Sequence, residues 1–165
     1  MAALAVGAAA PDFTLRTTDG KTLDLREALR RGPIVAAFFK TTCPTCQLAL
    51  PYVERLHKAY AGKNVTVIGV SQNDKGDTKE FMSEYGLSLP VLLDDRSSYS
   101  VSNAYGLTNV PTLFYISRDG EVGKSIVGWS RAEMEEVEGR IAQATGAPKA
   151  HIFRAGEDVP EFKAG

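Results

Sequence analysis

The sequence predicts an α/β domain with a central mixed β-sheet and helices on both faces. The apolar runs at 34–39 and 65–70 are continuous, as expected for strands that are covered on both faces. A helical pattern separates these two runs. Near the other end of the chain, two strand-like segments flank Asp119-Gly120, a dipeptide that favours a tight hairpin turn. Strands that alternate with helices and close with a hairpin are typical of this fold class.

Hydrophobic periodicity and turn residues predict the individual elements in order. The expected strands are 13–16, 21–25, 34–39, 65–70, 90–93, 112–116 and 121–127. The first two flank Asp19-Gly20 and form an N-terminal β-hairpin. The expected helices are 24–31, a long helix that ends near residue 60, 77–85, 97–105 and 130–145. Capping-box spacing supports two of the helix starts, at Asp77 and at Ser130.

The chain length of 165 residues predicts a single domain. We assign this domain to residues 1–146 and a C-terminal extension to residues 147–165. The extension has no periodicity and contains Pro148 and Pro160. It is therefore expected to lie as a strap across the domain or to be partly mobile.

Composition excludes several classes of protein. Lys and Arg total 19 against 20 Asp and Glu, so the net charge of −1 offers no footprint for nucleic acid. No apolar run approaches the roughly 18 residues of a membrane span, so we expect no membrane partner. Two cysteines exclude a disulfide-dense secreted scaffold. The N-terminus lacks the positive region of a signal peptide, which favours a cytoplasmic location.

The two cysteines carry most of the functional signal. They lie in Cys43-Pro44-Thr45-Cys46, between a buried strand and a helix. A cysteine at a helix start meets free backbone N–H groups and the positive end of the helix dipole, and both stabilise the reactive thiolate. Pro44 suits the first helical position because the missing N–H would be unpaired there. The spacing of three residues places both sulfur atoms on one side of the first turn.

This arrangement predicts thiol-disulfide exchange. Cys43 at the exposed edge would attack a disulfide of a protein or small molecule, and Cys46 would resolve the mixed disulfide. The expected partners are this substrate and a thiol reductant, with no cofactor. Inert paired thiols are one alternative, and a structural disulfide is another, although a four-residue loop gains little chain entropy from closure. A zinc site would need about four ligands, and His57 lies roughly 16 Å along the helix from Cys46, so no metal site is expected.

Several motifs together resemble the thioredoxin-like thiol-disulfide oxidoreductases, which share a superfamily with the peroxiredoxins. The resemblance spans residues 7–145. The matching features are the Gly7-x-x-Ala10-Pro11-Asp12-Phe13-x-Leu15 entry, Pro51 after the cysteine pair, Val110-Pro111-Thr112, and the glycines at 120 and 128. Residues 74–106 resemble the strand–helix insertion that separates this subgroup from minimal thioredoxins. The resemblance therefore implies a thioredoxin-like fold with redox and antioxidant activity.

The resemblance also implies a substrate-binding surface beside the cysteines. Val110-Pro111 resembles a loop whose cis proline presents backbone groups to an extended peptide. The residues expected to contact substrate are Thr42, Pro44, Thr45, Val110 and Pro111.

The sequence departs from the family pattern near the buried thiol. Ala37 and Ala49 stand where relatives carry acidic residues, so the usual proton acceptors for Cys46 are missing. Two alternatives to a disulfide reductase stay open. A peroxidase would use Cys43 against peroxide, but Lys40 stands where the hydroxyl residue of peroxiredoxins is found. A non-catalytic redox sensor or binding module would bind its partner without the cysteines.

Overall fold

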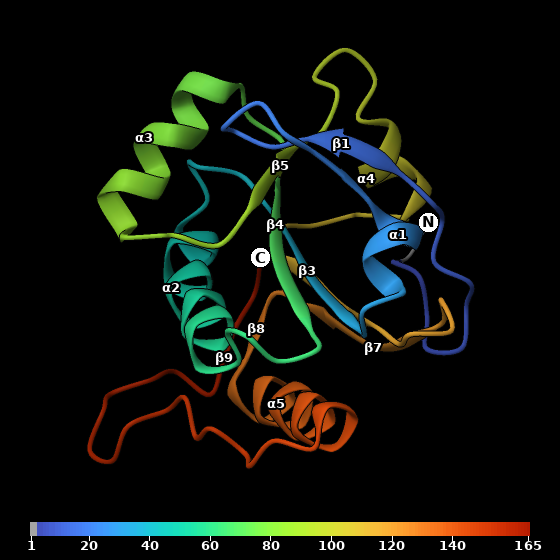
Figure 1. The fold of residues 1–165 in the computed structure, drawn as a ribbon. Coiled ribbons are helices and arrows are strands. Elements are labelled where there is room, and N and C mark those ends of the chain that lie inside the picture. Colours follow the sequence, from blue (N-terminus) through green and yellow to red (C-terminus); the bar gives the residue numbers. More distant parts are fainter. Residues whose placement is uncertain (1–2) are drawn as a thin grey trace.

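A mixed sheet of five strands lies at the centre of the structure, a computed structural model that describes residues 3–165. The strands are β3 (Ile34–Phe39), β4 (Thr66–Ser71), β5 (Val91–Leu93), β6 (Thr112–Ile116) and β7 (Val122–Val127). Their order across the sheet is β5–β4–β3–β6–β7 (Figure 1). The β3–β4 and β4–β5 pairs are parallel, whereas the β3–β6 and β6–β7 pairs are antiparallel. The predicted mixed sheet is confirmed.

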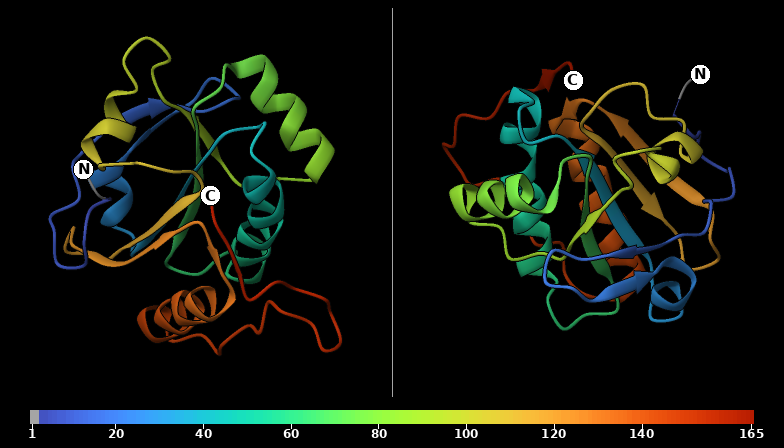
Figure 2. Two further views of the ribbon diagram at one scale, coloured as in Figure 1. Left: turned by 180° about the vertical axis from the view of Figure 1, so that it is seen from behind. Right: turned by 90° about the horizontal axis from the view of Figure 1, so that it is seen from above.

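Helices cover both faces of this sheet (Figures 1 and 2). They are α1 (Leu25–Leu29), α2 (Pro44–Ala59), α3 (Lys75–Tyr85), α4 (Ser100–Ala104) and α5 (Arg131–Thr145). Apolar residues of α2, α3 and α5 share one buried cluster, and those of α1 and α4 share the other. Among residues 3–165, no helix combines the length and apolar character needed to cross a membrane.

The central strand β3 supplies side chains to both clusters. Val35, Ala37 and Phe39 face α2, while Ile34, Ala36 and Phe38 face α1. Each of these six residues is at most 1% exposed. This two-sided burial explains why the segment is a continuous apolar run, because alternation would place polar groups in a core.

The N-terminal hairpin forms as its Asp-Gly turn predicts. Strands β1 (Thr14–Arg16) and β2 (Thr22–Asp24) pair in antiparallel register, with Leu15 opposite Leu23. Asp24 then begins α1, because its carboxylate accepts a hydrogen bond of 2.9 Å from Glu27 N–H.

The segment 74–106 contributes α3, β5 and α4, and β5 extends the sheet beyond β4. Both helix starts in this segment differ from the sequence prediction. Helix α3 begins at Lys75 because Asp74, rather than Asp77, caps it, with 2.8 Å between the Asp74 carboxylate and Asp77 N. Helix α4 is shorter than 97–105 because Asp95 accepts from the N–H and hydroxyl of Ser97, which holds that stretch in a turn.

Residues 147–165 run past α5, form an outer loop on the side of α2 and return to the domain as a strand (Figure 1). Strand β9 (Phe162–Lys163) pairs with β8 (Trp129–Ser130), an interaction that no sequence pattern predicts. Ile152 and Val159 are buried in the same cluster as α2 and α5. Arg55 of α2 also forms two hydrogen bonds with Glu157, of 2.8 and 2.7 Å, which holds the pKa of that carboxyl down to about 2.

The difference in burial predicts that a Phe→Ala substitution destabilises the protein strongly at position 38 and little at position 162. Phe38→Ala should lower the free energy of unfolding by about 3–5 kcal/mol, because Phe38 is fully buried and packs on Tyr105 and Phe114. Phe162→Ala, at a side chain that is 67% exposed, should change it by less than about 0.5 kcal/mol. Urea unfolding measures both values, and equal losses would contradict this account of the core.

Candidate active site

The topology brings three separate chain segments to one edge of the sheet. Strands β3 and β4 are parallel, so the residues that follow them, Cys43 and Gln72, meet at their common carboxyl edge. Strand β6 runs antiparallel to β3, so the residues that precede it, Val110 and Pro111, arrive at the same edge. The two cysteines and the proline loop are thus neighbours despite a separation of more than sixty residues.

Cys43 is the N-cap residue of α2. Its backbone is extended, and its Sγ accepts a hydrogen bond of 3.2 Å from Cys46 N–H. Pro44 occupies the first helical turn, as the sequence predicts. The hydrogen bond from Cys46 N–H to Cys43 Sγ satisfies one of the free N–H groups at the helix start, and it places the sulfur at the N-terminal end of α2. Cys43 is half-buried, so its sulfur lies at the surface of the site.

Cys46 lies one turn deeper and is fully buried. Burial raises the pKa of the Cys46 thiol well above its ordinary value, and hydrogen bonding with the Cys43 side chain adds to the rise. The backbone and charge of Lys40 lower this pKa, but burial prevails. Ala37 and Ala49 belong to the same buried cluster, so neither of these positions offers a carboxylate to the thiol.

The Val110–Pro111 peptide bond is cis, as the resemblance implies. The Val110 carbonyl oxygen accepts a hydrogen bond from Cys43 Sγ at 3.5 Å. Pro111 is buried, and its own carbonyl oxygen accepts from Gly128 N–H at 2.8 Å. The loop is therefore held by the residue that follows β7, and it presents the Val110 carbonyl to Cys43 Sγ.

A cavity of about 430 Å³ opens beside Cys43. Its walls come from the helix start, the end of β4, the proline loop and the C-terminal extension. The lining residues are Lys40, Cys43, Pro44, Gln72, Leu107, Thr108, Asn109, Val110 and Gly165. This volume lies within the range of small-molecule sites.

The structure separates the expected substrate-contacting residues. Pro44 and Val110 line the cavity with Cys43. Thr42 lines a different hollow against α3, and Thr45 is buried beneath the C-terminal extension. No sequence motif points to Gln72, Thr108, Asn109 or Gly165, which reach the cavity only through the fold.

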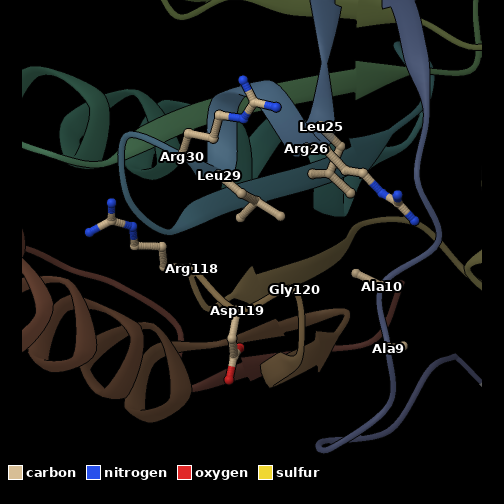
Figure 3. A pocket seen from close by; sticks show the side chains of 9 residues that line it. All are labelled: Ala9, Ala10, Leu25, Arg26, Leu29, Arg30, Arg118, Asp119 and Gly120. Carbon is tan, nitrogen blue, oxygen red and sulfur yellow. The ribbon is translucent and has the colours of Figure 1, made fainter.

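A second cavity, of about 490 Å³, lies at the opposite end of the sheet (Figure 3). It is lined by α1 and by the turn between β6 and β7, and it contains no cysteine. Its three arginines extend in different directions, and Arg26 pairs with Asp12 at 3.5 Å. Over residues 3–165, no group of three or more His, Cys, Asp or Glu side chains is placed to hold a metal ion.

Comparison with protein families matches the Redoxin family over residues 5–141. The chain belongs to the Redoxin family. Among curated proteins, this family member is similar to the thiol-disulfide oxidoreductase ResA of Bacillus thuringiensis strain Al Hakam. The two are 30% identical over 141 residues, which cover 85% of this chain and 79% of ResA.

A solved structure supports the same assignment. The chain is similar to a thiol:disulfide interchange protein DsbE of Chlorobium tepidum, with a TM-score of 0.76 and 27% identity. The match covers 87% of this chain and 99% of that one. The protein is thus a thiol-disulfide oxidoreductase with a thioredoxin-like fold. Both the expected fold class and the expected enzyme class are confirmed.

One comparison corrects the expected compartment. The chain is also similar to a secreted disulfide oxidoreductase of Mycobacterium tuberculosis, with a TM-score of 0.64 and 25% identity. That match covers 79% of this chain and 95% of the secreted protein. The relatives point away from the cytoplasm, so the prediction of a cytoplasmic location is wrong. The charge pattern of the first residues is a weak signal beside the likeness of the whole fold.

The unequal burial of the two thiols predicts unequal alkylation. Iodoacetamide at neutral pH should label Cys43 in the folded, reduced protein and leave Cys46 unlabelled, because Cys46 is buried and its thiol stays protonated. Mass spectrometry should detect both labels after unfolding, and none in folded Cys43→Ser. Equal labelling of both cysteines in the folded protein would contradict this picture of the site.

Proposed function

We propose that Cys43 is the attacking thiolate and Cys46 the resolving thiol of a disulfide exchange reaction. The observation that carries this assignment is the difference in access between two neighbouring sulfur atoms. Cys43 opens onto the cavity, whereas Cys46 is 0% exposed and lies beneath it. Only the first sulfur can meet an incoming disulfide, and the second can reach the first.

The proposed reaction has two steps. The Cys43 thiolate attacks one sulfur of the substrate disulfide, the substrate S–S bond breaks, and the departing thiolate takes up a proton. Cys46 then loses its proton and attacks Cys43 Sγ, which breaks the mixed disulfide and releases the second substrate thiol. The substrate gains two electrons and two protons, and the protein keeps a Cys43–Cys46 disulfide. A thiol reductant restores the dithiol by the reverse exchange.

The first step depends on the helix start. The Cys46 N–H donor stabilises charge on Cys43 Sγ before attack, and α2 adds the positive end of its dipole. The Val110 carbonyl group faces the same sulfur. When substrate displaces the Cys43–Val110 contact, this carbonyl becomes free to accept a hydrogen bond from the substrate backbone. Lys40 and Asn109 line the remaining walls of the cavity.

The second step requires deprotonation of a buried thiol. No acidic residue is among the groups that shift the pKa of Cys46, and positions 37 and 49 carry alanine. We therefore assign the proton to solvent that enters the cavity once Cys43 is in the mixed disulfide. Resolution is expected to be the slower step at neutral pH.

Trapping of the mixed disulfide tests the two roles. Cys46→Ser should accumulate a covalent adduct with a protein disulfide substrate, because the resolving thiol is absent while the attacking one remains. Cys43→Ser should form no adduct and should lose reduction of insulin disulfides. Non-reducing gel electrophoresis and mass spectrometry measure both outcomes, and an adduct in Cys43→Ser alone would reverse the assignment.

The raised pKa of the Cys46 thiol also predicts a pH dependence. Burial is the largest cause of this rise in pKa, and it disfavours the Cys46 thiolate. The resolution rate should therefore rise about tenfold per pH unit through neutral and mildly alkaline pH, because the thiolate is the nucleophile. Stopped-flow release of the second product thiol measures this rate, and a plateau below pH 8 would contradict the prediction.

The two alternatives from the sequence give different results in the same assays. A peroxidase would consume hydrogen peroxide rapidly through a Cys43 sulfenic acid and would reduce insulin disulfides slowly. A non-catalytic binding module would retain its partner in both Cys43→Ser and Cys46→Ser. Rapid insulin reduction that is lost in Cys43→Ser contradicts both alternatives.

A further inference from the structure

The last residues of the extension lie beside the cysteine pair. Strand β9 pairs with β8, with Phe162 opposite Ser130 and Lys163 opposite Trp129. From there the chain continues to Gly165, which forms part of the cavity wall next to Cys43. Figures 1 and 2 show the C-terminus returning from the outer loop of the extension to the neighbourhood of α2.

Residues 164–165 contact two loops that are expected to hold substrate: the cysteine loop at 43–46 and the proline loop at 110–111. Thr45, between the two cysteines, donates a hydrogen bond of 2.6 Å from its hydroxyl to the Ala164 carbonyl oxygen. On the other side, Gly165 lies so close to Val110 that a Cβ atom at position 165 would overlap the Val110 carbonyl oxygen. The segment therefore lies in the space between the cysteine loop and the proline loop.

Residues 163–165 also pack closely against Gly128, which follows β7. A Cβ atom on Gly128 would lie 2.8 Å from the Lys163 carbonyl oxygen and 3.2 Å from Gly165 N. Position 128 also has a φ of +79°, which favours glycine for a separate reason. Because residue 128 has no side chain, residues 163–165 can pass beside it and reach Val110.

The extension is held in two parts of unequal strength. Residues 152–160 form an anchor: Ile152 N–H donates to Glu138 over 2.7 Å, and Trp129 Nε1 donates to the Pro160 carbonyl over 2.7 Å. The Arg55–Glu157 pair lies between them in the sequence. Residues 162–165, in contrast, are all exposed and are held by a two-residue ladder and the Thr45 bond. This end can open while the anchor stays in place.

We propose that residues 162–165 form a gate that selects substrates by size. This inference rests on the proposed function of Cys43. With the gate closed, the cavity of about 430 Å³ admits a small disulfide to the sulfur. An extended polypeptide that pairs with the backbone of Val110 needs the space occupied by Ala164 and Gly165, so the gate must open first. The gate thus favours small-molecule disulfides over disulfides within polypeptide chains.

The size of the effect follows from how often the gate is closed. A gate closed about 90% of the time reduces the apparent affinity for a competing polypeptide about tenfold, because only the open fraction binds. The short tether to the anchor favours closure, since it holds the segment at an effective concentration of about millimolar. A small disulfide that enters the closed cavity is not affected by this competition.

A shortened chain that ends at Glu161 tests the gate. It retains the anchor and the hydrogen bond of 3.0 Å from Arg131 N–H to the Glu161 carbonyl. The measurement is kcat/KM for insulin and for hydroxyethyl disulfide, with the same reductant. We expect the insulin value to rise about fivefold to tenfold in the shortened chain and the hydroxyethyl disulfide value to stay within about twofold.

Two point variants of the full chain complete the test. Gly165→Val should raise the insulin value in the same direction, because its side chain cannot fit against the Val110 carbonyl. Val6→Ala is the control outside the segment, and it should leave both values unchanged because its side chain is 62% exposed and is not part of the cavity wall. Circular dichroism and thermal unfolding show that each variant is folded.

The outcomes separate the gate from the exchange reaction itself. If the full chain turns over neither disulfide, the proposed function fails and the gate with it. If the full chain turns over both, and the folded shortened chain and Gly165→Val show no rise in the ratio of the two kcat/KM values, the gate alone is wrong. A fall of the insulin value in the shortened chain would also overturn the gate, since residues 162–165 would then help to bind polypeptide.

Discussion

A sulfur atom caps the helix on which this site is built. A helix start leaves four backbone N–H groups without partners, and here one of them, Cys46 N–H, donates to Cys43 Sγ over 3.2 Å. This bond holds Cys43 at the end of β3, keeps its sulfur outside the helix and sets Cys46 one turn below. The unequal access of the two thiols, on which the proposed division of labour rests, depends on this contact and on the buried strand that leads into it.

The opposite side of the site comes from chain segments far away in sequence. Because β6 runs antiparallel to β3, the loop before it meets the helix start, and the Val110 carbonyl reaches Cys43. The C-terminal extension closes the third side through Ala164 and Gly165. Cys43 Sγ is thus bordered by a helix start, by the Val110–Pro111 loop and by residues 164–165 of the extension. In the proposed gate, access to this sulfur depends on movement of residues 162–165.

Local signals predicted most elements because each has a direct physical cause. Continuous apolar runs require two-sided burial, and the Asp-Gly turns at 19–20 and 119–120 favour hairpins. Two helix starts differ from the prediction, each for its own local reason. Asp74 and Asp77 are both able to cap α3, and the first does so. Asp95 holds Ser97 in a turn that a periodic pattern alone reads as helix.

The sequence by itself determined the chemistry: two cysteines three residues apart, a proline between them and a buried strand before them define a helix start with a reactive thiol. The same residues and their neighbours indicated the family. Only the tertiary structure decided what surrounds that thiol. Strands of two residues such as β8 and β9 carry no periodicity, and the pairing of positions 129–130 with 162–163 follows from packing of Ile152, Val159 and Trp129 in a shared core. That packing brings Gly165 to the cavity, which no local pattern encodes.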